Sequence, residues 1–214
     1  MPKYGLIFDL DGTLTDSGPG IIHSVMYALE KLGYPVASYE QLRTFVGPPL
    51  GSSFLSYGVR EEEVEEAIRR YRENYNVNGK KENECYPGIS DLLRRLQSEG
   101  YALYVATSKP ETLAKSILDG FGLSQFFTII AGATYDHTRE NKDDVIRYLL
   151  DQCGDEFIPI MIGDTVFDVI GARKVGIDCI GVAWGYGEAA DMRAEGALAI
   201  ADTPSDLYEI LKAL

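Results

Sequence analysis

The 214-residue chain is poor in the residues that usually build disulfide scaffolds or soft-metal sites: it has three cysteines and two histidines. Cys85, Cys153 and Cys179 are widely separated, so no pair has the close spacing of metal ligands. Their odd number favours reduced thiols. Cys179 lies in an apolar run and is best explained as a small core residue. The sequence therefore predicts neither a disulfide framework nor a cysteine-bound metal.

The chain also lacks positive charge and long apolar runs. Its 20 Lys and Arg residues face 33 Asp and Glu residues, which gives a net charge of −13. Such a field repels nucleic acids and anionic membranes, although local cations can still hold a small anionic substrate. No apolar run approaches the roughly 20 residues that span a bilayer, and none resembles a signal peptide. We expect a cytoplasmic monomer or homodimer that binds neither nucleic acid nor membrane.

Five short apolar runs carry the strand signal, and they are nearly continuous, as in strands that are covered on both faces. They are Tyr4–Phe8, Tyr101–Ala106, Phe127–Ala131, Ile158–Ile162 and Asp178–Ala183. Helical patterns separate the later four. These are Ile89–Glu99, Glu111–Gly120, Lys142–Gln152 and Val166–Val175. This alternation predicts an α/β fold with a doubly wound parallel sheet.

One connection is too long for a single crossover. Between the first strand and Tyr101, the segments Ser17–Leu32, Tyr39–Phe45 and Glu61–Tyr75 have helical patterns, and nothing resembles a strand. The sequence therefore predicts an inserted all-helical cap domain over residues 16–86, with a core domain formed by residues 1–15 and 87–214. Such a cap is placed to cover the ends of the strands.

Acidic side chains follow two of the predicted strands. Asp9 and Asp11 come after the first strand, and Asp164 and Asp168 come after the fourth. Because the carboxyl ends of parallel strands meet at one edge, these acids should lie together, where a hard cation such as Mg²⁺ makes the charge tolerable. Alternatively, Asp164 caps the next helix and Asp168 is an ordinary first-turn acid.

Hydroxyl and basic side chains near the remaining strand ends are candidates for binding an anion. Thr107 and Ser108 precede a helix, where they could bind a phosphate or only cap the helix. Lys142 follows the third strand and could balance the acids, and Arg139 is the competing candidate. Arg43, in the cap, could meet a leaving group.

These motifs appear in a fixed order: Asp9-x-Asp11-Gly-Thr, a Thr/Ser pair, a lysine, and Gly-Asp164-x-x-x-Asp168. Over essentially the whole chain they resemble the haloacid dehalogenase (HAD) superfamily, in its phosphatase branch with a helical cap. Within it, the chain is similar to the phosphoglycolate phosphatase-like group, which includes 5′-nucleotidases and pyrophosphatases. The resemblance implies the strand order 5-4-1-2-3, numbered along the chain, with the first strand central.

The resemblance also implies roles for the four acids. Asp9 would be the nucleophile that forms an aspartyl-phosphate, and Asp11 would be the general acid and then the base. Mg²⁺ would be bound by Asp9, the backbone carbonyl of Asp11, and Asp164. Asp168 would support these ligands from behind.

For the phosphate, the resemblance implies contacts to Thr107 and Lys142, with Ser108 helping through its backbone. Many relatives follow the lysine with Pro-x-Pro, whereas Lys142 is followed here by Asp143-Asp144. Arg139 therefore remains a second candidate for the lysine's role.

The resulting hypothesis is a Mg²⁺-dependent phosphomonoesterase for a small phosphorylated metabolite, phosphoglycolate phosphatase-like or 5′-nucleotidase-like. Asp11 disfavours a dehalogenase, because a halide leaving group needs no proton. A phosphosugar mutase of the family would carry an arginine in the cap loop, but Gly47–Gly51 has no charge. This uncharged loop also argues mildly against a second strongly anionic group on the substrate. A pyrophosphatase and a non-catalytic phosphate-binding regulatory module are competing hypotheses.

Overall fold

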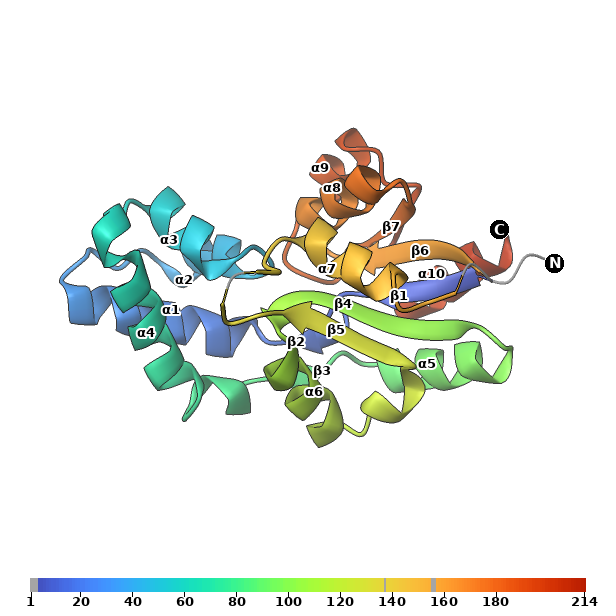
Figure 1. Cartoon of the computed structure of the whole chain (residues 1–214), viewed down its shortest axis with the longest axis horizontal. Coiled ribbons are helices and arrows are strands. Elements are labelled where there is room, and N and C mark those ends of the chain that lie inside the picture. The colour runs from blue at the N-terminus through green and yellow to red at the C-terminus, as the bar shows by residue number, and fades with distance from the viewer. Residues whose placement is uncertain (1–3, 137, 155–156) are drawn as a thin grey trace.

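A computed structural model describes residues 4–136, 138–154 and 157–214 of the chain. Its centre is a six-stranded sheet with the order β5-β4-β1-β6-β7-β8, in which every neighbouring pair is parallel (Figure 1). The strands are β1 (Tyr4–Phe8), β4 (Ala102–Pro110), β5 (Ile129–Ala133), β6 (Ile158–Gly163), β7 (Asp178–Val182) and β8 (Ala199–Ala201).

The predicted parallel sheet is confirmed, and the five predicted strands occur in the expected order with β1 in the middle. β4 continues past its predicted end at Ala106 as far as Pro110, and its register against β5 shifts after Thr107. β8 was not predicted, because three residues are too few to show a pattern.

Helices cover both faces of the sheet. One face packs against α5 (Ile89–Ser98), α6 (Glu111–Gly120) and α10 (Pro204–Lys212), and the other against α7 (Lys142–Leu150), α8 (Val166–Val175) and α9 (Ala189–Ala194). A single-turn 3₁₀ helix, Ser124–Phe126, follows α6. β1 contributes side chains to both faces of the sheet. Leu6 and Phe8 pack on the side of α5, α6 and α10, and Ile7 packs on the side of α7, α8 and α9. None of the helices in the described ranges is long and apolar enough to cross a membrane.

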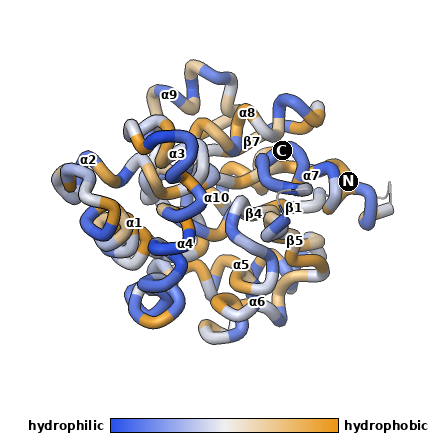
Figure 2. The backbone as a smooth tube through the Cα atoms, turned by 60° about the vertical axis from the view of Figure 1, so that its left-hand side comes forward, coloured by the Kyte–Doolittle hydropathy of each residue, from blue (hydrophilic) through white to orange (hydrophobic). Residues whose placement is uncertain are grey.

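The cap is a helical unit with its own apolar cluster, which includes Leu29, Phe54 and Ile68. Hydrophobic and hydrophilic residues alternate along its helices (Figure 2), as expected when one face of each helix is buried. Its elements are α1 (Gly18–Leu32), α2 (Tyr39–Leu42), α3 (Leu50–Tyr57) and α4 (Val64–Tyr75), with 3₁₀ turns at Arg43–Phe45, Glu61–Glu63 and Gly79–Lys81.

The two segments that join cap and core pair with each other. β2 (Thr15–Asp16) and β3 (Glu84–Cys85) form a two-stranded antiparallel sheet, with Thr15 opposite Cys85. The prediction that the insertion contains no strand is therefore wrong at its two ends. Strands of two residues have no detectable alternation, so only the fold reveals them. The predicted cap boundaries, residues 16 and 86, lie at or next to these two strands and stay a prediction.

A glycine-mediated contact at the base of the cap gives a first prediction. A Cβ on Gly20 of α1 would lie 2.0 Å from the carbonyl oxygen of Gly79. Gly20→Ala should therefore lower the free energy of unfolding by about 1–3 kcal/mol, measured by urea denaturation. In the matched control, Gly120→Ala at the end of α6, the added Cβ meets nothing within 4 Å. Equal stabilities of the two variants would show that this contact is not tight.

Candidate active site

The chain leaves β1 through a tight turn that brings acidic residues together. The Asp9 N–H donates to the Ile162 carbonyl of β6 at 2.9 Å, and the Leu14 N–H closes back on Leu10 at 2.9 Å. Gly12 has a φ of +84°, and a Cβ there would lie 2.1 Å from Asp164 Oδ2. Glycine thus satisfies both the turn geometry and the close approach of the second acidic segment.

Asp164 lies at the end of β6 and is fully buried. Its Oδ1 accepts from the Thr13 hydroxyl at 3.0 Å and its Oδ2 from the Tyr186 N–H at 2.8 Å. The Trp184 indole N–H holds the same turn by donating to the Thr13 carbonyl at 3.0 Å. The N-cap of α8 is Thr165, so the interpretation of Asp164 as the helix cap is wrong. The carboxylate is instead fixed from two sides and aimed at the end of β1.

Asp168 has two tasks in the structure. Its Oδ2 accepts from the Thr165 N–H at 3.0 Å and the Thr165 hydroxyl at 2.9 Å, so it closes back on the start of α8. Its Oδ1 lies 2.9 Å from the Lys142 ammonium. Both interpretations of this acid therefore hold: it stabilises the first turn of α8 and also belongs to the polar cluster.

Lys142, the first residue of α7, is buried among the acids. Its Nζ lies 2.7 Å from Asp9 Oδ1 and donates to the Ala106 carbonyl at 3.2 Å. Burial alone would lower the pKa of Lys142, but the Asp168 and Asp9 carboxylates outweigh it and raise that pKa. Arg139 lies elsewhere and pairs with Glu111 at 2.8 Å. Of the two candidate cations, only Lys142 is in contact with Asp9.

Three carboxylates share this small volume. Asp9, Asp164 and Asp168 each offer an oxygen within 4.8 Å of the others, and all three are buried. Burial raises the pKa of Asp9 to about 7, with Lys142 opposing and Asp168 reinforcing the shift. Burial also raises the pKa of Asp164 well above its usual range. Lys142 supplies one positive charge against three carboxylates, so a divalent cation with a preference for hard oxygen ligands fits this donor set.

Asp11 is held apart from that cluster by Lys109, a residue that the sequence motifs do not single out. Lys109 Nζ lies 2.7 Å and 2.9 Å from the two Asp11 carboxylate oxygens, and the Ser17 hydroxyl also donates to Asp11. Burial would lower the pKa of Lys109, but Asp11 more than compensates and the pKa is raised. Thr107 and Lys109 are two residues apart in β4, so their side chains lie on the same face of the strand. That spacing was the signal in the sequence that could have identified Lys109.

Thr107 and Ser108 do not cap the following helix, because the N-cap of α6 is Pro110 without any side-chain hydrogen bond. The Thr107 hydroxyl accepts from the Lys109 N–H at 3.2 Å and is buried. Ser108 lines a cavity together with Asp11 and Lys109.

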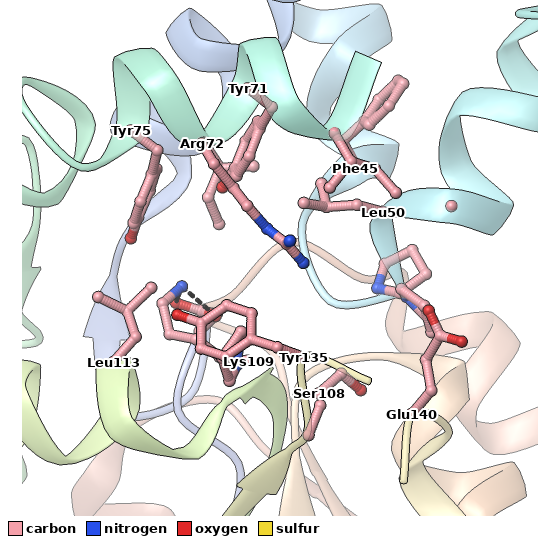
Figure 3. Close-up of a pocket in the computed structure, with 18 of the residues that line it drawn as sticks. Phe45, Leu50, Tyr71, Arg72, Tyr75, Ser108, Lys109, Leu113, Tyr135 and Glu140 are labelled. Carbon is pink, nitrogen blue, oxygen red and sulfur yellow. Dashed lines mark hydrogen bonds and ion pairs between the residues drawn. The ribbon is translucent and has the colours of Figure 1, made fainter. Parts of the chain in front are cut away.

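This cavity, of about 100 Å³, lies between cap and core (Figure 3). The cap loop Gly47–Pro49 forms one wall, and a Cβ on Gly47 would lie 3.0 Å from the Thr165 methyl. Arg43 does not line the cavity. It stacks on Tyr186 at 5.2 Å from the ring centre, in a second groove of about 730 Å³ that contains none of the four acids. The structure thus does not bring Arg43 to Asp11.

The Asp11–Lys109 pair gives a stability prediction. Lys109→Met leaves a buried carboxylate without its counter-ion, which should lower the free energy of unfolding by about 3–5 kcal/mol in urea denaturation. Lys115→Met breaks an exposed pair with Glu111 and should cost less than about 1 kcal/mol. Adding Asp11→Asn to Lys109→Met should restore part of the loss. A Lys109 variant as stable as the Lys115 variant would refute the argument.

Known proteins resemble the chain throughout. Residues 6–182 match the haloacid dehalogenase-like hydrolase family. A 5′-nucleotidase of Pseudomonas aeruginosa is 43% identical over 192 residues, 88% of this chain and 86% of that protein. The tyrosine-protein kinase PtkA of Mycobacterium tuberculosis is 42% identical over 96% of this chain and 72% of that protein. The crystal structure of a predicted phosphatase from Clostridium acetobutylicum has a TM-score of 0.95 at 40% identity over all of both chains. The chain therefore belongs to the haloacid dehalogenase-like hydrolase family, as one of its phosphatases.

Proposed function

We propose that this phosphatase is a Mg²⁺-dependent phosphomonoesterase that cleaves a small phosphorylated metabolite through an aspartyl-phosphate. The observation that carries the proposal is the separation of two acids on one turn. Asp9 faces the carboxylate cluster and Lys142, whereas Asp11 faces the cavity and Lys109. Two acids in different surroundings can perform different tasks.

The residues present fit a magnesium ion. Asp9 and Asp164 would hold it with the backbone carbonyl of Asp11, and Asp168 would orient Asp9 through the shared Lys142. When bound, the ion would supply the charge neutralisation that lets an anionic phosphate approach a carboxylate.

Asp9 and Asp11 then have different roles in the reaction. A carboxylate oxygen of Asp9 forms a bond to phosphorus while the bond between phosphorus and the leaving oxygen breaks. In this step Asp11 acts in its protonated form, not in the ionised form that pairs with Lys109, and it donates its proton to that oxygen, so the first product leaves as an alcohol. Asp11 then accepts a proton from a water molecule, which attacks phosphorus and displaces Asp9. Inorganic phosphate is the second product, and both acids return to their initial states.

Two further side chains and one backbone group support the phosphate in this proposal. Lys142 is already charged and buried next to Asp9, so it can also reach a phosphoryl oxygen. The Thr107 hydroxyl and the Ser108 backbone lie at the carboxyl end of β4, beside the turn that carries Asp11. Preorganised donors at this edge are effective because little water competes with them.

The competing functions have less support from the described residues. A mutase of this family would carry an arginine in the cap loop itself, and Gly47–Pro49 has none. A non-catalytic module that only binds phosphate would not need a second acid at the cavity. Asp11 is such an acid, since it lines the cavity and pairs with Lys109.

The first test removes the nucleophile. The wild-type protein should hydrolyse p-nitrophenyl phosphate with Mg²⁺ and lose this activity in excess EDTA. Asp9→Asn should lower kcat by at least about 10³-fold, because an amide does not attack phosphorus. Asp91→Asn, an exposed acid on α5, is the control and should keep full activity. Activity in EDTA, or a fully active Asp9→Asn protein, would refute the mechanism.

The second test separates proton transfer from binding. Asp11→Asn should lower kcat by about 10²- to 10⁴-fold, because the leaving oxygen loses its proton donor. Its affinity for inorganic phosphate and Mg²⁺, measured by calorimetry, should stay within a few-fold of the wild type. If both affinities collapse instead, Asp11 has a structural role.

A further inference from the structure

One arginine of the cap helix α4 differs from its neighbours. Arg69 and Arg70 both pair with Glu66, at 2.6 Å and 2.8 Å. Arg72 makes no ion pair in the described part of the chain, and its guanidinium lies 4.9 Å from the ring centre of Tyr135. In a protein with a net charge of −13, a half-buried arginine without a carboxylate partner needs an explanation.

Arg72 points toward the reaction site. Figure 3 shows its guanidinium extending from α4 into the cavity, above Lys109 and Tyr135. Asp11, the proton donor of the proposed mechanism, lines the same cavity. A leaving group that takes its proton from Asp11 must therefore extend into the space that Arg72 faces.

Tyr75 is a second, independent sign of a ligand on this wall. Its side chain is 1% exposed, and its hydroxyl contacts the Lys109 ammonium but has no acceptor for its own proton among the described residues. Figure 3 shows this hydroxyl pointing from α4 toward Lys109, whose ammonium lies 5.0 Å from the Tyr75 ring centre. An ammonium can only donate to this hydroxyl, so the phenol O–H remains available, and an acceptor on a ligand is its natural complement.

We propose that Arg72 and Tyr75 form a subsite for a second anionic group, carried by the leaving group of the substrate. A guanidinium binds a carboxylate or phosphate through two parallel hydrogen bonds, and the phenol adds a third donor. The inference deepens the proposed phosphatase function and rests on it. The uncharged Gly47–Gly51 loop had argued against such a group, but the charge comes from α4 instead.

The size of the cavity limits the leaving group. Its volume of about 100 Å³ is well below the roughly 300–1,000 Å³ of sites for larger ligands. The larger groove near Arg43 contains no proton donor of the mechanism. The substrate class is therefore a phosphate monoester of a short hydroxy acid, or of a short diol with a second phosphate.

Three two-carbon esters test the subsite: 2-phosphoglycolate, ethane-1,2-diyl bisphosphate and the uncharged-tail control 2-hydroxyethyl phosphate. In the wild type, kcat/KM for at least one charged-tail ester should exceed that of the control by about 10- to 100-fold. The better of the two identifies the anion as carboxylate or phosphate. A ratio near one, or a higher kcat/KM for adenosine monophosphate than for all three, would overturn the subsite.

Variants assign the preference to α4. Arg72→Gln should abolish the ratio between charged and uncharged tails while changing kcat/KM for the control ester less than about 3-fold. Arg72→Lys should keep part of the ratio, because it retains the charge but not the planar fork. Tyr75→Phe should reduce the ratio by about 3- to 10-fold, and the outward-facing Arg69→Gln should not change it. If Arg72→Gln slows all esters equally, it only holds the cap in place and the subsite is overturned.

A binding measurement separates this inference from the proposed function. Calorimetry with the Asp9→Asn protein should show tighter binding of the charged-tail ester by a similar factor, without turnover. Preferential binding in a protein whose wild type hydrolyses none of the esters would overturn the phosphatase mechanism and leave the subsite intact. Hydrolysis of all three esters at equal rates, with equal affinities, would overturn the subsite and leave the phosphatase mechanism intact.

Discussion

The ion pairs of Lys142 are the interaction on which the rest of the site depends. Asp9 and Asp168 come from segments far apart in the sequence, and one buried ammonium contacts both. Burying a carboxylate is unfavourable unless it is paired with a cation. The attraction in such a pair offsets the loss of hydration only when the two groups are held in a good geometry. The sheet provides that geometry because β1 and β6 are neighbours and end at the same edge. The charge cluster therefore depends on the parallel sheet.

Much of the fold was predictable because it repeats. The core strands are apolar runs separated by helical patterns, and the motif acids mark the carboxyl ends of β1 and β6. The shortest elements were not predictable: β8 and the β2–β3 pair contain too few residues for a period to emerge. α3 was missed because its glycine and serines are weak helix formers. Boundaries were also shifted where tertiary packing extended an element, as in β4, whose last residues pair with Ala133.

The candidate site was predictable in its acids and less so in its cations. Asp9, Asp11, Asp164 and Asp168 follow strands and are conspicuous in the sequence, and the structure brings them to one edge. Arg72 is an ordinary surface residue type by sequence, and only three-dimensional proximity distinguishes it from Arg69. Lys109 pairs with Asp11, and its only signal in the sequence was its spacing from Thr107.

The short β2–β3 pair also constrains how the cap can move. Both connections between cap and core pass through it, and the two strands are hydrogen-bonded to each other. Two separate linkers would let the cap twist, slide and tilt, whereas two hydrogen-bonded strands leave it fewer independent movements. Asp16 in β2 accepts a hydrogen bond from Tyr186, whose N–H donates to Asp164. Tyr186 thus ties β2, one of the two connections to the cap, to a carboxylate of the cluster, so a displacement of the cap at β2 acts directly on the site.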